Sequence, residues 1–526
     1  MNEILGWSNN EAMFKQLLII VCGATTAFAQ YAPQSYDLSR RRALDDIVPE
    51  ERLASNVIID ILPTSTPDTL WLGTGNGVTR IRFGPDDIPG HPDLSLFETM
   101  GEAQGLGKGG VSGLYWSDSI LWAAFAFDTS VGISGAGGGL AYSRDQGRNW
   151  TWFPQPRDKK YHLDEHGRDD TLGYWPTTTN VDNITYDIAL SDSNVWIVSK
   201  GGGLRKHAFA ADYTDYNDTT GWRVVSPDTF AFHPAERLNH RAFSVLYAED
   251  ALWVGTADGI NKSTDEGRTW QSFRSANSGI SGNFITGMGY QEATHTIWAA
   301  TWRAEGQTES YAVSKTTDGG ANWTVHLTEQ QIEQAIGHAE TPRAHSFGFD
   351  SMTVYVCDDI GLWKTLDGGD SWALFPSMRD VQTGHRFDEA PIYAALKEHG
   401  RLWAGGVDGL AASYDDGATW HLFQAALPLN DASRSVQTYA YPTPWSPSRF
   451  GPVKMRYQSS GGNVKVTIYD FAMSKVVELP TVSRASGEEY ESWDGRKDGT
   501  IVANGTYFYK IEKPGGEVWG KLIVLD

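Results

Sequence analysis

The sequence predicts an all-β protein, with a large ring of repeated four-stranded sheets followed by a small β-sandwich. Three observations lead to this class: an internal repeat, a turn motif at a fixed place in that repeat, and a change of pattern after Leu429. The composition agrees, because 56 glycines and 12% aromatic residues among 526 are typical of many short strands joined by tight turns.

An aromatic residue inside a short apolar strand marks each repeat. Anchors of this kind lie at Trp71, Trp122, Trp196, Trp253, Trp298, Tyr355 and Trp403. An apolar strand precedes each anchor, and a glycine step into a third strand follows most of them, as Gly259-Ile260 follows Trp253. With a fourth strand in each unit, the spacing of roughly 40–50 residues plus insertions is typical of propeller blades. We therefore predict a seven-bladed β-propeller over residues 54–428.

A sharper motif, Ser/Thr-x-Asp-x-Gly-x-x-Trp, introduces the fourth strand of five blades, while blades 1 and 3 lack it. The Asp and Trp of its five copies are Asp145, Trp150, Asp265, Trp270, Asp318, Trp323, Asp367, Trp372, Asp415 and Trp420. The motif resembles the Asp-box, or BNR repeat, of sialidase-like and sortilin-like propellers. We expect the Asp to cap turn N–H groups, the Gly to adopt a left-handed conformation and the Trp to pack between sheets. A turn repeated around a ring favours scaffolding over metal ligation or acid catalysis.

The N-terminus has the pattern of an export signal. Residues 17–28 form an apolar run after Lys15, and Ala27-Phe28-Ala29 has the form of a signal-peptidase site. The run is shorter than the ~20 residues that span a bilayer. We predict a signal peptide over residues 1–29, with Met13 as an alternative start, a linker over residues 30–53, and no transmembrane segment in the mature chain. Export to the cell surface or medium follows, with the periplasm as the alternative.

The last part of the chain has a pattern of its own. After a linker over residues 429–445, alternating strands and tight turns predict a small Ig-like β-sandwich over residues 446–526. Ile468-Tyr469-Asp470 and Gly505-Thr506-Tyr507 resemble motifs of the flagellar-hook-capping type of Ig-like domain. That resemblance implies a type IX secretion sorting domain and the secretion machinery as a partner. A plain Ig-like spacer is the alternative.

Charge and motifs exclude several functions. The net charge of −22 argues against nucleic acid and anionic membrane surfaces as partners. The sequence has no Gly-rich phosphate loop, no Ser-His-Asp order and no cysteine cluster, and His162-x-x-x-His166 lacks a third ligand. With export, only Cys357 remains, which we expect in the core. We expect no metal and no cofactor.

Candidate ligand-binding residues lie in loops that enter the first strands, on the axial face. His240-Arg241, Arg343 with His345, and His385-Arg386 precede the first strands of three blades, and the long loop over residues 154–180 adds Arg168 and Trp175. Sialidases bind a carboxylate with three arginines, and the resemblance implies that Arg241, Arg343 and Arg386 could act in this way.

The resemblance to sialidases is incomplete. Arg80-Ile81-Arg82 lacks the proline of the sialidase Arg-Ile-Pro motif, and no Tyr/Glu nucleophile pair can be placed. We therefore predict a binding propeller for a glycan or a cell-surface protein, with no assigned catalytic residue. The alternatives are a glycoside hydrolase, either sialidase-like or of the inverting two-carboxylate type, and an assembly factor for membrane complexes.

Overall fold

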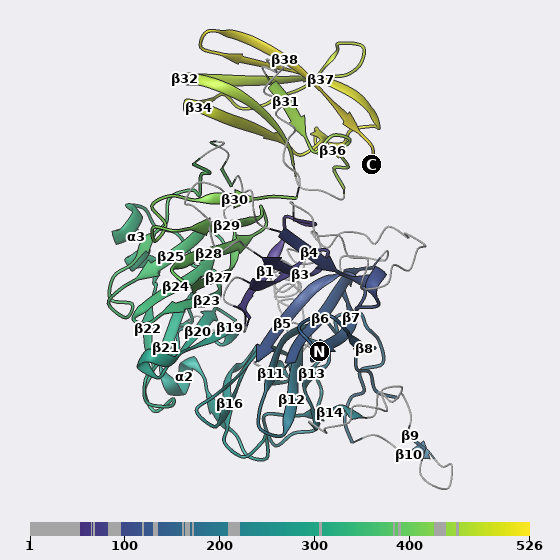
Figure 1. The fold of residues 1–526 in the computed structure, drawn as a ribbon, viewed down its shortest axis with the longest axis vertical. Helices are drawn as coiled ribbons and strands as arrows, with labels where there is room; N and C mark the ends of the chain where they lie inside the picture. The colour runs from purple at the N-terminus through teal and green to yellow at the C-terminus, as the bar shows by residue number, and fades with distance from the viewer. Residues whose placement is uncertain are drawn as a thin grey trace, which may run out of the picture. The chain divides into compact units, whose positions relative to one another are not determined.

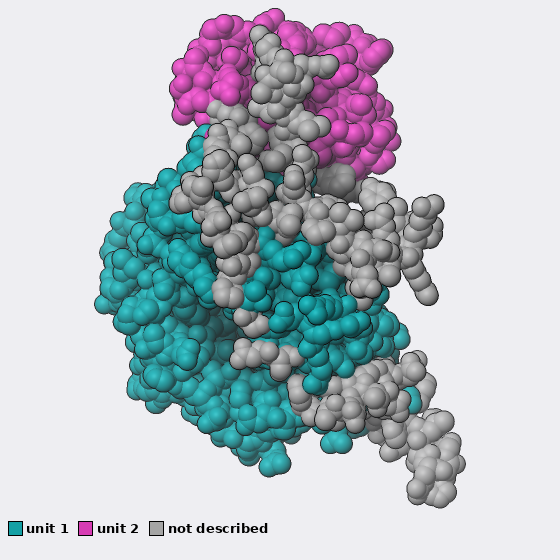
Figure 2. Space-filling model, viewed as in Figure 1, with its two compact units in different colours: residues 1–382, 386–425 teal, residues 383–385, 426–526 magenta. Residues whose placement is uncertain are grey.

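The computed structural model describes residues 53–425 and 438–526, apart from gaps at 65, 67–68, 83–95, 118–119, 130–134, 160–161, 164–168, 171–172, 209–220, 305–307, 382–383, 385, 388–390 and 449–451. The predicted signal peptide and the linker to residue 52 lie outside the described residues. The chain divides into two compact units, Met1–Gln382 with Arg386–Ala425, and Thr383–His385 with Ala426–Asp526 (Figure 2).

The first unit is a seven-bladed β-propeller, so the predicted all-β class is confirmed. Each blade is an antiparallel sheet of four strands in sequence order (Figure 1). Blades 1 to 3 are β1 (Ile58–Pro63), β2 (Thr69–Thr74), β3 (Gly77–Arg82), β4 (Leu96–Met100); β5 (Gly110–Ser117), β6 (Ile120–Asp128), β7 (Gly135–Ser143), β8 (Thr151–Phe153); and β11 (Thr185–Leu190), β12 (Asn194–Ser199), β13 (Gly203–Ala208), β14 (Arg223–Val225).

Blades 4 to 7 follow the same order. They are β15 (Ala242–Ala248), β16 (Ala251–Thr256), β17 (Gly259–Ser263), β18 (Gln271–Phe273); β19 (Phe284–Gln291), β20 (Thr296–Trp302), β21 (Ala312–Thr316), β22 (Thr324–His326); β23 (Ala344–Asp350), β24 (Thr353–Asp358), β25 (Gly361–Thr365), β26 (Ala373–Leu374); and β27 (Ile392–Glu398), β28 (Arg401–Gly406), β29 (Leu410–Ser413), β30 (His421–Phe423). The connections hold the hairpin β9 (His162–Leu163) and β10 (Asp169–Asp170), and the helices α2 (Ser275–Ser278), α3 (Glu329–Ile336), η3 (Glu102–Gln104), η5 (Leu238–His240) and η6 (Glu292–Thr294).

The ring closes by packing rather than by exchange of a strand. Each first strand contacts the first strands of both neighbouring blades, and β27 contacts β1. All four strands of blade 1 come from the start of the unit and all four of blade 7 from its end. Ile58 and Leu72 of blade 1 share one buried cluster with Trp403 of blade 7. The Ala425 N–H donates to Asn56 Oδ1 at 2.6 Å across the same junction.

The repeated aromatic residues hold adjacent blades together. Trp253 is 2% exposed, and Trp323 of the next blade meets it edge to face, with ring centroids 6.3 Å apart. Gly267 has φ +77°, and a Cβ there would lie 2.9 Å from the ring of Trp196. Both the backbone conformation and the lack of space therefore favour glycine at this turn position. The motif therefore couples a blade that carries it to the preceding blade.

Hydrogen bonds within the turn explain the other motif positions. The Thr365 hydroxyl donates to Asp367 Oδ1 at 2.8 Å and accepts from the Gly369 N–H at 2.9 Å. Asp367 accepts from the side chain and the backbone N–H of Ser371, and these bonds hold the pKa of its carboxyl well below the ordinary value. Equivalent bonds occur at Asp145, Asp265, Asp318 and Asp415.

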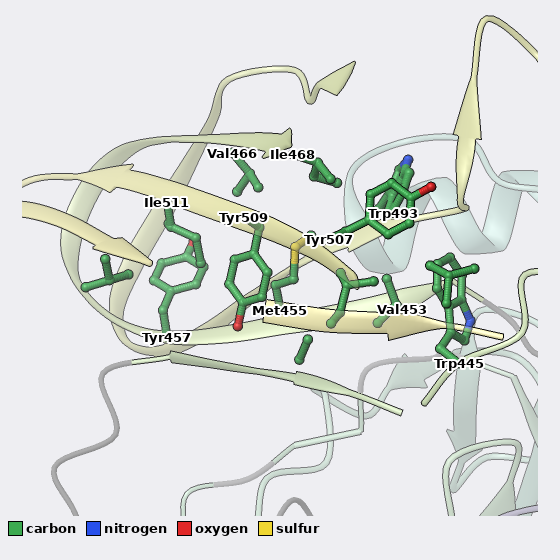
Figure 3. Packing of buried hydrophobic residues seen from close by; sticks show 14 of the residues in the cluster. Trp445, Val453, Met455, Tyr457, Val466, Ile468, Trp493, Tyr507, Tyr509 and Ile511 are labelled. Carbon is green, nitrogen blue, oxygen red and sulfur yellow. The ribbon is translucent and has the colours of Figure 1, made fainter. Parts of the chain in front are cut away.

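The second unit has its own core. β32 (Val453–Tyr469) pairs over its first half with β31 (Thr438–Tyr441) and β34 (Val482–Trp493), and over its second half with β33 (Lys475–Glu478) and β37 (Gly505–Lys513). β38 (Gly516–Val524) pairs with β37, and β35 (Arg496–Lys497) pairs with β36 (Thr500–Ile501). Met455, Tyr509 and Trp493 are among the buried side chains that fill the space between these strands (Figure 3). The Ig-like classification of this unit stays a prediction.

Candidate functional site

The seven first strands line a channel at the centre of the propeller. In each of them the pairing register with the second strand shifts once, near the start of the strand, as in a β-bulge. The extra residues at these shifts are Ile59, Ser112, Tyr186, Phe243, Thr286, His345 and Tyr393, and all of them line one cavity of about 440 Å³. Each blade therefore contributes one bulge side chain to the same space.

Close approach of neighbouring first strands sets the size of this channel. A Cβ at Gly287 would lie 2.0 Å from the carbonyl oxygen of His345, and one at Gly113 would lie 2.9 Å from that of Tyr186. The hydroxyls of Thr286 and Ser346 donate to carbonyls of the next blade, at 3.0 and 2.5 Å. Glycines and inter-blade hydrogen bonds thus fix the positions from which the lining side chains project.

A continuous arc of rings covers one side of the channel, from blade 3 to blade 7. We call this the aromatic arc, and it consists of Tyr186, Phe243, Phe284, Trp302, His345 and Tyr393. Consecutive ring centroids along the arc lie 5.5, 4.7, 6.1, 5.7 and 5.0 Å apart. All six residues sit near the beginning of a first strand or at the end of β20, so they gather at the face where the inter-blade loops enter. Such a surface can pack against the apolar face of a ligand.

Two carboxylates also line the channel. Asp60 of β1 accepts the Ile61 N–H at 3.0 Å and the Leu114 N–H of blade 2. Asp187 of β11 accepts the Ile188 N–H at 2.8 Å and the Val245 N–H of blade 4 at 2.9 Å. Both side chains are half-buried, and they belong to the lining of the channel.

Their position changes their acidity. Burial, followed by the negative charge of Asp187, raises the pKa of Asp60 to about 7, against the lowering effect of its two backbone donors. Burial raises the pKa of Asp187 to about 6. These two carboxyls therefore change charge near neutral pH, which suits either acid–base chemistry or recognition of a positive charge.

His345 connects the channel to a second acidic group. Its Nε2 atom lies 2.7 Å from Asp359 Oδ1, and its ring contacts Trp302 and Tyr393. The neighbouring Asp358 is fully buried and accepts the Arg343 and Ile360 N–H groups, and burial raises its pKa to about 6. The imidazole is thus held in one orientation at the rim.

The predicted basic residues occupy several environments. Arg241 donates to the carbonyls of Pro234 and Ala235, at 2.6 and 2.9 Å. Arg343 is 54% exposed and lies 3.7 Å from Asp359. His240 is 1% exposed, bonds through Nε2 to Asp228 at 3.0 Å, and accepts the His233 N–H through Nδ1.

The remaining candidates either do not line the channel or lie outside the described residues. Trp175 is 56% exposed and packs on the ring of His233 at 4.8 Å. Arg386 is half-buried, and its backbone pairs with that of Arg379 in an isolated antiparallel β-bridge. Arg168 and His385 lie outside the described residues. Of the predicted site residues that the structure describes, His345 is the one that lines the channel, and convergence of the three arginines stays a prediction.

Sequence reasoning missed Asp60, Asp187 and, apart from His345, the members of the aromatic arc. A signal was present, because Ile59-Asp60-Ile61 and Tyr186-Asp187-Ile188 each place a carboxylate in an apolar first strand. The arc gave no comparable signal, since aromatic residues occur throughout all four strands of the blades.

Comparisons with known proteins give structural neighbours only. No protein-family model matches the chain, and no curated protein matches it. One similar structure is PorZ of Porphyromonas gingivalis, described as a bacterial surface component of the type IX secretion system, with 14% identity, a TM-score of 0.35, and coverage of 89% of this chain and 66% of that one. Another is the extracellular domain of a one component system from B. thetaiotaomicron, with 13% identity, a TM-score of 0.41, and coverage of 89% and 57%.

A third similar structure is a GH74 xyloglucanase from Xanthomonas campestris, with 12% identity, a TM-score of 0.46, and coverage of 89% of this chain and 74% of that one. This chain spans between half and two thirds of the length of the first two neighbours. The assignment of seven blades rests on the sheets themselves.

Within the residues that the structure describes, no helix is long and apolar enough to cross a lipid bilayer.

Proposed function

We propose that the protein is an exported, surface-exposed or secreted propeller that binds a glycan or a cell-surface protein at its central channel. The observation that carries the proposal is the cavity of about 440 Å³ with its aromatic arc and two carboxylates. Ligand sites are typically about 300–1,000 Å³, mostly apolar, with a few placed polar groups. One or two sugar rings, or the side chain of a protein ligand, fit this description.

A channel-filling variant tests the site. The complete chain is screened against a glycan panel and against surface proteins of the same cell, and Ile59→Phe is compared with Val325→Phe. Ile59 lines the channel, whereas Val325 is exposed on β22. We expect the first variant to lose binding at least tenfold and the second to keep it. Equal binding by both variants would exclude the channel as the site.

Catalysis is the second candidate, because Asp60 and Asp187 lie in one cavity and both have raised pKa values. An inverting glycosidase needs one carboxyl as acid and one as base, about 6.5–9.5 Å apart. Hydrolysis by the wild type, lost in Asp60→Asn and Asp187→Asn while binding persists, would support this function. Binding without hydrolysis of any bound glycan would leave the binding function alone.

An anionic ligand on the rim is a separate hypothesis. The triple variant Arg241→Ala, Arg343→Ala, Arg386→Ala should keep its melting temperature and lose binding of acidic glycans if the arginines share a ligand. Each charged hydrogen bond is worth roughly 1.5–3 kcal/mol when desolvated. Unchanged binding across the panel would retire the arginine site.

Export and sorting complete the proposal. The signal-like residues 1–29 support a mature chain that begins at Gln30, which N-terminal sequencing of the exported protein checks. The motifs of the last unit support a role in type IX sorting. A chain that ends at Ala425 should then collect in the periplasm of a type IX host, and normal appearance at the surface would reduce the last unit to a spacer.

A further inference from the structure

The charges along the channel have one sign. The described residues that line it include the carboxylates Asp60 and Asp187, and no lysine or arginine. The aromatic arc adds six rings, and the face of an aromatic ring attracts cations. The carboxylates of the lining are thus opposite in sign to the basic pairs in the surrounding loops. A ligand that enters this space meets carboxylates and aromatic side chains.

We propose that the channel binds an organic ammonium group, with the ammonium beside Asp60 and Asp187 and the carbon skeleton against the aromatic arc. This inference rests on the proposed function and narrows its ligand. Two sources carry the same chemistry: an amino sugar with an unmodified amine, and the amine of a lysine side chain or peptide terminus. In both, a compact cation is joined to an apolar surface, which is the alkyl stem of lysine or the C–H face of the sugar ring.

The hydrogen bonds already made by the carboxylates favour an ammonium over a metal ion. A carboxylate has about four acceptor sites. Asp187 uses three of them, for the Ile188 and Val245 N–H groups and, at 3.2 Å, the Ser244 hydroxyl. Hard divalent cations require six or more oxygen ligands, whereas an ammonium is bound by one or two acceptors and by aromatic faces.

The nearby cations are held by other partners. Arg241 donates to backbone carbonyls of its own loop, and Arg343 lies beside Asp359. Neither belongs to the channel lining. The negative charge of Asp60 and Asp187 is therefore not neutralised by a cation of the lining, and a ligand can supply that charge.

The pH dependence of binding follows from the groups that face the channel. The titratable side chains of its lining are Asp60, Asp187, His345, Tyr115, Tyr186, Tyr247 and Tyr393. Burial raises the pKa of Asp60 to about 7 and of Asp187 to about 6, so between pH 5 and pH 7 Asp187 becomes mostly ionised and Asp60 becomes about half ionised. Affinity for an ammonium should increase by roughly tenfold or more over this range.

The test uses the complete chain and matched pairs of probes in calorimetric titrations. The sugar pair is the glucosamine disaccharide and its N-acetylated form, and the peptide pair is Nα-acetyl-lysine amide and its Nε-acetylated form. We expect one amine to bind at least tenfold more tightly than its acetylated form, a difference of about 1.4 kcal/mol. The pair that shows the difference identifies the source of the amine. Asp60→Asn and Asp187→Asn should each weaken amine binding tenfold or more, while Asp192→Asn, at an exposed turn of blade 3, should not.

The possible outcomes separate the inference from the proposed function. Equal affinity for amine and acetylated probes, or tighter binding of the acetylated forms, would overturn the ammonium site and leave a ligand-binding propeller. No binding of any of these probes would also overturn it, and a negative glycan and protein screen would additionally remove the proposed function. If the Asn variants do not fold, the wild type decides, because amine affinity that is flat or falls between pH 5 and pH 7 contradicts the inference.

Discussion

Raising the pH from 5 to 8 should destabilise the propeller, because its channel carboxyls become charged while they stay half-buried. The pKa of Asp60 is raised from the ordinary value of 3.8 to about 7, and that of Asp187 to about 6. The folded state then binds more protons than the unfolded state across this range. The stabilising contribution is complete below the unfolded pKa and is lost as the pH rises through the folded pKa.

The size of the effect follows from the linkage relation. Between pH 5 and pH 8 it gives a loss of about 2.5 kcal/mol for Asp60 and about 1.5 kcal/mol for Asp187 in the free energy of unfolding. Asp358, whose pKa burial also raises to about 6, adds a loss of the same sign. His326 opposes them, because burial lowers its pKa and its contribution grows as the unfolded imidazole loses its proton. The stabilisation that His326 gains with rising pH is nearly complete above a pH of about 6.5, which is the ordinary pKa of histidine.

Urea unfolding at constant ionic strength, followed by tryptophan fluorescence, measures this change. Asp60→Asn should remove the largest part of the slope above pH 6.5, whereas Asp192→Asn, an exposed control, should retain it. A free energy of unfolding that stays constant or rises between pH 6.5 and pH 8 would refute the reasoning. An unchanged slope in Asp60→Asn would show that other groups cause it.

Three further predictions concern the scaffold. Trp420→Ala should lower the free energy of unfolding by ~3–5 kcal/mol, because the ring is 3% exposed, whereas Trp152→Ala, with 44% exposure, should cost far less in the same urea assay. Thr365→Val should cost ~1–3 kcal/mol, because the buried Gly369 N–H loses its acceptor, and Thr365→Ser should restore most of that loss. A chain that ends at Ala425 should keep the propeller's unfolding transition, because the buried cluster of the second unit lies entirely beyond that residue. Loss of that transition in calorimetry would show that the propeller depends on the second unit.

The fold was predictable because successive blades repeat the same residue types at corresponding positions. The anchor at Trp253, the glycine step at Gly259-Ile260 and the turn at Asp265 recur with the same spacing in blades 6 and 7, so independent copies support one interpretation. Blade 3 lacks the full turn motif, yet β14 (Arg223–Val225) directly follows Trp222, as expected from the repeat. In the second unit, the alternating apolar residues over 464–469 indicate a strand, but they are only the end of a much longer strand, β32. Its earlier half contains Gln458-Ser459-Ser460-Gly461-Gly462, which conceals the strand pattern because those residues are polar or glycine.

The candidate site was much less predictable, because it depends on what does not repeat. The bulge position of the first strand holds a different residue in almost every blade, from Ile59 and Ser112 to His345 and Tyr393. A search for a repeated pattern does not detect these residues, because they differ from blade to blade. Which side chains then meet across the channel depends on the closure of the ring, since Asp60 and Asp187 come from blades that are not adjacent.

The division between repeated and variable positions also indicates where selectivity resides. The carboxylates of the turn aspartates accept hydrogen bonds from nearby groups of the same turn, as Asp367 does from the N–H and hydroxyl of Ser371. Few of their acceptor sites therefore remain for a ligand. The bulge positions have the opposite character, since the seven blades carry six different residue types on the same local backbone. Substitution at a bulge position can therefore change the charge and shape of the channel without weakening the blades. For this reason the chemistry of the ligand should follow the carboxylates and rings of the channel rather than the repeat that defines the fold.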